Sequence, residues 1–122
     1  MFMKLYDSEL KVMELLWQKG ELKAKQIADE LKERTGWNKN TSYTVIKKLV
    51  DKGAVERREP GFCCVPLIDR ESARQSALSE LVDRFYQGSV GLLFASLLTR
   101  EELTSEEVNR LREMIDEKKC GQ

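Results

Sequence analysis

Residues 38–67 read NKNTSYTVIKKLVDKGAVERREPGFCCVPL, in which a helical pattern gives way to a hairpin pattern. Apolar side chains recur at helical spacing over 39–52. Asn38 is a candidate N-cap at the start of this helix, and Gly53 ends it. Two short β-prone runs then flank Pro60-Gly61, a strong turn signal. The stretch therefore predicts one helix followed directly by a β-hairpin.

Two further helices are expected before this stretch. Apolar residues spaced i, i+3, i+6 and i+7 from Leu10 predict a helix over 7–18, with Asp7 or Ser8 as its cap. A second amphipathic run predicts a helix over 22–34. Three helices and a hairpin, joined by short connections, fit a winged helix-turn-helix within about 70 residues.

The rest of the chain is expected to be wholly helical. The predicted helices run from Asp69 or Ser72 to Tyr86, from Ser89 to Thr99, and onward from Thr104. The predicted fold class is therefore mainly α. A winged helix-turn-helix domain is expected over 1–70 and an α-helical domain over 71–122.

The balanced charge of the 122 residues conceals a basic segment. The chain has 21 Lys and Arg and 21 Asp and Glu, so its formal net charge is zero. Residues 1–70 hold 14 basic and 11 acidic side chains, whereas 71–122 hold 7 and 10, and within 38–58 six basic side chains stand against two acidic ones. Because salt screens long-range attraction, a polyanion responds to a local basic patch rather than to the net charge. The alternative is an ordinary solvated surface of mixed charge, which has the same composition.

The composition weighs against an enzyme. The sequence contains no histidine, which excludes imidazole acid–base catalysis and histidine-dependent triads. It has no glycine-rich phosphate loop, metal-ligand cluster or nucleophile motif, so neither a cofactor nor a metal is expected. Three cysteines, an odd number, exclude a complete disulfide framework. No apolar run approaches the ~18 residues of a membrane span, so a cytoplasmic protein without membrane insertion is expected.

One face of the helix over 39–52 has the side-chain types that read DNA. Its apolar stripe must face the first two helices, which leaves a polar and basic face for the major groove. An Asn amide bonds adenine bidentately, Thr and Tyr contact phosphate or a thymine methyl, and Lys neutralises phosphate. The candidate DNA-binding residues are Lys39, Asn40, Thr41, Ser42, Tyr43, Thr44, Lys47 and Lys48 on this helix, and Arg57 and Arg58 on the hairpin. The alternative is a winged-helix protein-interaction module without sequence-specific DNA binding.

The C-terminal half is predicted to pair with a second copy of the chain. About 50 residues is a poor size for an independent core, yet residues 89–98 are apolar on nearly all sides. These side chains can be buried against the N-terminal domain or against another protomer, and a homodimer is the favoured prediction. The candidate dimerisation residues are Leu81, Phe85, Tyr86, Leu92, Leu93, Leu97, Leu111 and Ile115.

Three segments resemble the BlaI/MecI/CopY family of bacterial repressors. Residues 10–17 resemble the first helix of that family, 40–53 resemble its recognition helix, and 84–88, RFYQG, match its RFY-x-G segment. The resemblance extends over about 5–119. It implies a homodimeric winged-helix transcriptional repressor that binds a palindromic, double-stranded operator.

The branches of that family carry further expectations. In the β-lactam-responsive branch the repressor acts on a resistance operon and is cut in its C-terminal helices after a membrane-bound sensor protease signals. By analogy the cut falls at Ser96-Leu97, where the family has Asn-Phe. The copper-responsive branch has four C-terminal cysteines, whereas only Cys120 stands there in this chain, so copper sensing is not expected. The adjacent Cys63 and Cys64 should point to opposite faces of a strand, one buried and one exposed, and are interpreted as small hydrophobic side chains rather than a thiol switch.

Overall fold

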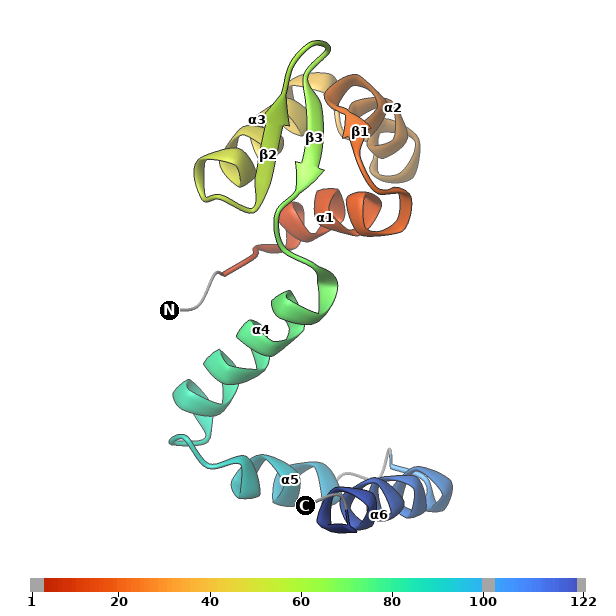
Figure 1. Ribbon diagram of the computed structural model, residues 1–122, viewed down its shortest axis with the longest axis vertical. Helices are drawn as coiled ribbons and strands as arrows, with labels where there is room; N and C mark the ends of the chain where they lie inside the picture. Colours follow the sequence, from red (N-terminus) through yellow and green to blue (C-terminus); the bar gives the residue numbers. More distant parts are fainter. Residues whose placement is uncertain (1–3, 100–102, 121–122) are drawn as a thin grey trace. The chain divides into compact units, whose positions relative to one another are not determined.

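The computed structural model describes residues 4–99 and 103–120, which form six helices and one small sheet (Figure 1). The first part has helices α1 (Asp7–Lys19), α2 (Ala24–Thr35) and α3 (Lys39–Asp51), and strands β1 (Leu22–Lys23), β2 (Val55–Arg58) and β3 (Cys63–Pro66). The later helices are α4 (Arg70–Phe85), α5 (Val90–Leu98) and α6 (Ser105–Cys120). This order confirms the predicted fold class, a winged helix-turn-helix followed by helices.

The three strands form one antiparallel sheet in the order β1-β3-β2. Strands β2 and β3 are the arms of a hairpin over residues 55–66, here called the wing, and its tip projects beyond the helices (Figure 1). Cys64 lies on the central strand, opposite Leu22 of β1 and Arg57 of β2. The wing is thereby held on one side by β1 and through it by the start of α2.

The second helix is shorter at its start than the sequence predicted. A helix was expected over 22–34, but Leu22 and Lys23 pair with β3 and the helix begins at Ala24. The strand pairing satisfies backbone groups that the first turn of a helix leaves without partners. Because the partner strand is distant in the sequence, a local apolar pattern contains no sign of it.

A closed apolar core lies between the three helices and the sheet. Its side chains are Val12, Met13, Leu15 and Leu16 from α1, Ala24, Ile27 and Leu31 from α2, Val45, Ile46 and Leu49 from α3, Ala54 from the α3–β2 connection, and Val55 and Cys64 from the wing. All of them are almost entirely removed from water, which is the main source of stability for a unit of this size. The apolar stripe of α3 therefore faces inward, as predicted, and the opposite side of this helix faces solvent.

Two polar arrangements fix the ends of α3. Asn38 caps its start, as predicted, because its side-chain oxygen accepts a hydrogen bond from the N–H of Thr41 at 2.8 Å. At its other end, Lys52 pairs with the buried carboxylate of Glu9 at 2.7 Å. Glu9 also accepts the N–H of Tyr6, the N-cap of α1, at 2.9 Å, whereas one of the next two residues was expected to cap this helix. The start of α1 and the end of α3 are thus joined by one ion pair.

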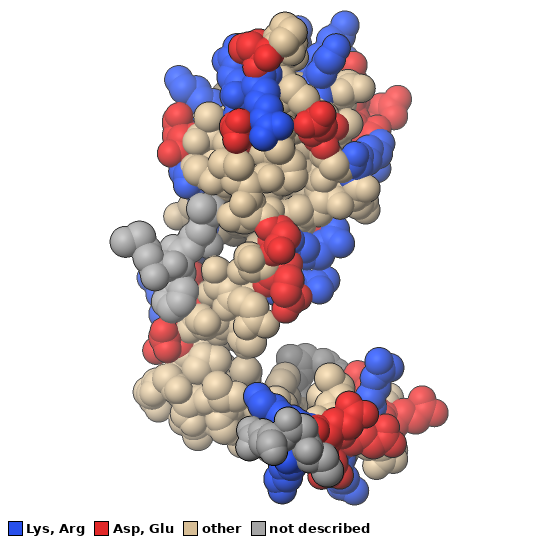
Figure 2. Space-filling view, in the orientation of Figure 1, with Lys and Arg blue, Asp and Glu red and all other residues tan. Residues whose placement is uncertain are grey.

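The chain divides into two compact units, Met1–Leu78 and Ser79–Gln122. In the second unit, Val82 is the one buried apolar residue among 79–99 and 103–119. Residues 85–99 include no charged residue, and Figure 2 shows an uncharged patch at the lower left, where α4 is followed by α5. None of the described helices is both long and apolar enough to span a membrane. The assignment of 1–70 and 71–122 to separate functions stays a prediction.

Candidate nucleic-acid interface

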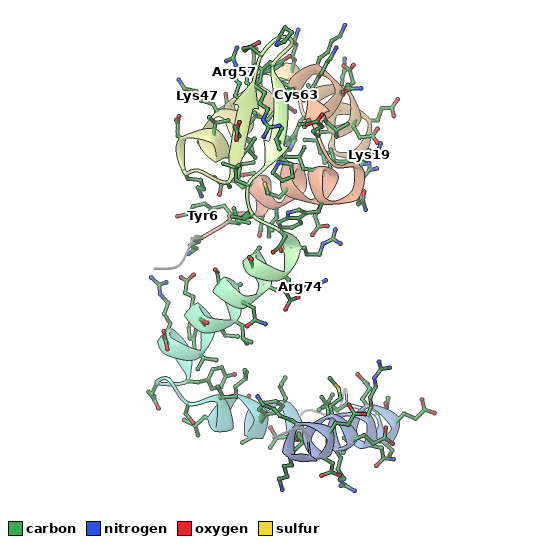
Figure 3. The ribbon with its side chains drawn as sticks, in the orientation of Figure 1. Tyr6, Lys19, Lys47, Arg57, Cys63 and Arg74 are labelled. Atoms are coloured by element: carbon green, nitrogen blue, oxygen red, sulfur yellow. The ribbon has the colours of Figure 1, made fainter. Side chains whose placement is uncertain are left out.

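The solvent-facing side of α3 is polar and basic. Lys39, Lys47 and Lys48 are exposed on it, and none of the three forms an ion pair with any residue in 4–99 or 103–120. Figure 3 shows Lys47 on α3, with Arg57 and Cys63 on the wing strands. Three positive charges on the exposed part of one helix, none of them paired among the described residues, make a surface on which an anion, such as a DNA phosphate, is stabilised.

The uncharged side chains of this face differ in what they can offer a base or phosphate. Asn40 is exposed, so its amide can present both a donor and an acceptor to a base edge. The hydroxyl of Thr44 donates to the carbonyl of Asn40 at 2.8 Å, and that of Thr41 donates to Asn38 at 3.0 Å. Because each hydroxyl proton is used within the helix, these threonines cannot donate a hydrogen bond to a phosphate. They can offer a ligand an acceptor oxygen and a methyl group.

Ser42 does not belong to this face, and its prediction as a DNA-binding residue requires correction. Its side chain is 0% exposed, and its hydroxyl has no hydrogen-bond partner among the described residues. The physical reason is helical phase: Ser42 lies three and four positions before Val45 and Ile46, on the inward stripe. A serine is small enough to occupy that stripe, although its polarity suggested the opposite face.

Tyr43 has a mixed position between the core and the surface. It is half-buried, and its ring meets the ring of Phe62 edge-to-face with centres 6.0 Å apart. The ammonium group of Lys39 lies 5.6 Å from the centre of the Tyr43 ring. Tyr43 therefore joins α3 to the wing and is not simply a free side chain on the predicted DNA-facing surface.

The two wing arginines are exposed, but each pairs with a glutamate. Arg57 donates to Glu59 at 2.6 Å, and Arg58 donates to Glu56 at 2.9 Å. In Figure 2 positive and negative side chains accordingly lie side by side over the end of the first unit that carries the wing. Neither arginine is therefore a free cation, because each guanidinium already shares its charge with a carboxylate. Exposed pairs of this kind are weak and each guanidinium has further N–H donors, so a phosphate can still bind there.

The acidic partners on the wing were missed by the sequence reasoning, although a signal existed. In Val55–Glu59, Glu56 and Arg58 alternate with Arg57 and Glu59, and residues two apart on a strand share a face. Glu59 also accepts the N–H of Phe62 at 3.1 Å. The hydrogen bond from Arg57, and then that from Phe62, lower the pKa of Glu59 below its usual value.

The wing cysteines lie as their alternation predicted, with one difference. Cys64 is fully buried, and burial raises the pKa of its thiol to about 11, so it is a neutral core residue at physiological pH. Cys63 is half-buried rather than exposed, and lies between Lys23 of β1 and Arg58 of β2 in the sheet register. The role of Cys64 as a small hydrophobic side chain agrees with this burial.

The predicted dimerisation residues are largely open to solvent. Leu81, Phe85, Leu92 and Ile115 are exposed, and Tyr86, Leu93, Leu97 and Leu111 are half-buried. The exposed fraction of Phe85 reaches 71%, which is high for a phenylalanine. The predicted cleavage residues Ser96 and Leu97 both lie inside α5, and the hydroxyl of Tyr86 donates to that of Ser96 at 3.4 Å. An uncovered apolar surface of this extent is typical of an interaction site.

A family model described as Penicillinase repressor matches residues 5–117. The chain belongs to the penicillinase repressor family. This confirms the resemblance seen in residues 10–17, 40–53 and 84–88. The penicillinase repressor of Bacillus licheniformis is 27% identical to this chain over 118 residues, which are 95% of this chain and 92% of that protein. The methicillin resistance regulatory protein MecI of Staphylococcus aureus (strain N315) is 23% identical over 117 residues, 94% of this chain and 95% of that protein.

Solved structures of this family resemble the first unit. The solution structure of the DNA-binding domain of the repressor BlaI is similar with a TM-score of 0.53 and 28% identity, over 57% of this chain and 87% of that one. The Bacillus licheniformis BlaI monomer in complex with the blaP half-operator has a TM-score of 0.53 and 27% identity, over 59% of this chain and 90% of that one. The winged helix of this penicillinase repressor family member therefore has the fold of a BlaI DNA-binding domain.

Proposed function

We propose that this protein is a homodimeric, sequence-specific transcriptional repressor that inserts α3 into the major groove of a palindromic operator. The observation that carries the proposal is the solvent-facing side of α3, where Lys39, Lys47 and Lys48 are unpaired among the described residues beside the exposed Asn40. A relative with the same fold, the BlaI monomer of Bacillus licheniformis, forms a complex with the blaP half-operator, which supports duplex DNA as the partner.

Affinity and selectivity would come from different side chains of the interface. The lysines of α3, together with Arg57 and Arg58 of the wing, neutralise phosphates and supply affinity for any duplex. Asn40 reads a base edge, while Thr41 and Thr44 offer methyl groups and acceptor oxygens. Tyr43 contributes less to base reading than its place on the helix suggested, because its ring is engaged with Phe62.

Two copies of α3 would be linked through the second unit. Its exposed apolar side chains give a second copy a surface to bury, and the twofold relation of a homodimer matches a palindromic operator. The two recognition helices then enter successive major grooves about one helical turn apart. When one protomer binds its half-site, the linked α3 of the other protomer is held at a high effective concentration near the second half-site. Separating the protomers therefore weakens binding without altering α3.

Relief of repression by proteolysis would act on this link. The proposed cut between Ser96 and Leu97 lies in the last turns of α5, where the carbonyl of Ser96 accepts a hydrogen bond from the hydroxyl of Thr99 at 2.8 Å. A peptidase needs an extended substrate, so this end of α5 has to open locally before cleavage. A membrane-bound sensor protease responding to a β-lactam is the proposed trigger, and a β-lactam-resistance-like operon the proposed target. A mass spectrum of the protein from cells exposed to a β-lactam should show two fragments that meet at this bond; an intact chain, or a cut elsewhere, would overturn the assignment.

Fluorescence anisotropy with duplex DNA from upstream of this protein's own gene tests the function. We expect dissociation constants in the nanomolar range at physiological salt and a preference over a scrambled duplex of about 10³-fold or more. The slope of log K against log salt should reach several units, since about 0.9 is lost for each neutralised phosphate. The Lys11→Ala variant, which removes an exposed charge from α1 instead of α3, is the matched control and should bind as the wild type does.

Other outcomes of this measurement would count against the proposal in different ways. Weak binding of equal strength to both duplexes would mean that the protein has only a general affinity for DNA. The proposal of a sequence-specific repressor acting on that operator would then be wrong. No binding to either duplex at low salt would favour the protein-interaction module, in which the polar face of α3 meets another protein. Light scattering supplies the oligomeric state, because a mass near 14.1 kDa at micromolar concentration would exclude the homodimer.

A further inference from the structure

A row of four side chains connects the wing to α3. The guanidinium carbon of Arg57 lies 3.7 Å from the centre of the Phe62 ring, and that ring meets the ring of Tyr43 edge-to-face at 6.0 Å. The ammonium group of Lys39 lies 5.6 Å from the centre of the Tyr43 ring. Cation–ring and edge-to-face contacts of this kind are attractive and depend on geometry. Two cations proposed to meet phosphates thus stand at the two ends of one aromatic pair.

Phe62, in the middle of the row, has a strained backbone. Its φ is 50°, in the left-handed region that bulky residues rarely adopt, and it directly follows Gly61. Its N–H donates to Glu59 at 3.1 Å, and its carbonyl accepts the N–H of Ala24, at the start of α2, at 3.0 Å. A strained conformation persists only where the surroundings determine it, and here a turn, a helix start and two ring contacts do so. Such strain is often found at functional sites.

Arg57 is held in place but remains able to bind an anion. Its guanidinium carbon lies 3.7 Å from the centre of the Phe62 ring, and its Nε–H donates to Glu59 at 2.6 Å. Its side chain is nevertheless 50% exposed. A guanidinium has five N–H donors, so others remain for a phosphate when Nε is occupied. An arginine held in this way loses less side-chain entropy on binding than one that is free at the edge of a hairpin.

We propose that Phe62 is a positioning residue, which holds Arg57 of the wing at a fixed place relative to Tyr43 and hence to α3. The wing guanidinium would then meet the phosphate backbone of the same duplex whose groove α3 enters. Glu59 assists by tying the Phe62 N–H and Arg57 to one carboxylate. This inference rests on the proposed DNA-binding function and adds to it a residue that touches no DNA.

A double-mutant cycle with Phe62→Asn and Arg57→Met tests this role. Asparagine tolerates the left-handed conformation and lacks the ring, so the backbone is preserved while the positioning contact is lost. In the otherwise wild-type chain, Phe62→Asn should weaken operator binding by about tenfold, the order expected for one misplaced charge-assisted contact. The salt slope should fall by about 0.9, as for one phosphate. Phe62→Tyr, which keeps the ring, should have the operator affinity and the salt slope of the wild type.

The decisive comparison is made in the Arg57→Met background. If Phe62 acts through Arg57, then Phe62→Asn causes no further loss of affinity there, because the group that it positions has been removed. An equal loss in both backgrounds, or wild-type binding by Phe62→Asn, would overturn the inference while the DNA-binding function stands. If the wild-type protein binds neither duplex, both fail together. Should Phe62→Asn not fold by circular dichroism, Phe62→Leu takes its place in the same cycle, with the same two outcomes.

Discussion

The two units of this chain treat their apolar side chains in opposite ways. In the first unit three helices and a sheet surround the core, and Leu16, Ile46 and Leu49 are almost wholly inaccessible. In the described part of the second unit Val82 alone is buried, while Phe85 and Leu92 are exposed. The first unit therefore has what it needs to be stable alone. The second exposes an apolar surface of the kind that the proposed homodimer would bury, so its stability should depend on the concentration of the chain.

The largest expected effect comes from placing a charge on this uncovered surface. Leu92→Asp, on α5, should separate the protomers because a carboxylate buried in an apolar interface is strongly destabilising. The light-scattering mass should fall from about twice 14.1 kDa to that value. Operator affinity should fall by about 10²-fold or more, since two linked half-sites become independent. Asn109→Asp, at an exposed polar position of α6, adds the same charge and should change neither quantity. If the Leu92→Asp protein is still a dimer, α5 does not belong to the dimer interface.

The next effect tests the closed core of the first unit. Leu16→Ala should lower the free energy of unfolding by about 2–5 kcal/mol, because it removes a fully buried side chain and leaves a cavity. This loss should be the same at every protein concentration in urea unfolding. Leu92→Ala, the same change in the second unit, should act mainly through association, so its effect on unfolding should vary with concentration. If the two variants behave alike across a hundredfold dilution, the contrast between the units is wrong.

A smaller pair of effects separates affinity from selectivity within α3. Lys48→Ala should weaken binding to every duplex about equally and reduce the salt slope by about 0.9, because one phosphate contact is lost. Asn40→Ala should mainly relax the preference for one base pair, which costs about 1–3 kcal/mol of discrimination. Anisotropy across a panel of operators with single substitutions measures both. The reverse pattern would exchange the roles of these two side chains.

Sequence patterns predicted the parts of the structure that depend on near neighbours. The inward stripe of α3, its cap at Asn38 and the hairpin turn all follow from residues a few positions apart. Strand β1 escaped prediction because Leu22 and Lys23 are fixed by a partner strand far along the chain. The α3 surface of the candidate site was predictable from helical phase, whereas the contact between Tyr43 and Phe62 was not, since it joins a helix to a turn.

The smallest expected effect concerns Ser42, whose polar hydroxyl lies on the buried side of α3. Its substitution separates a structural role from a DNA-binding role. A buried hydroxyl without a partner among the described residues is unfavourable, and alanine also has the higher helix propensity. Ser42→Ala should therefore raise the free energy of unfolding by about 1 kcal/mol and leave operator affinity unchanged. Urea unfolding and anisotropy on the same preparation check the two parts. A loss of affinity with unchanged stability would return Ser42 to the DNA-binding face, and would mean that α3 rotates about its axis when it enters the groove.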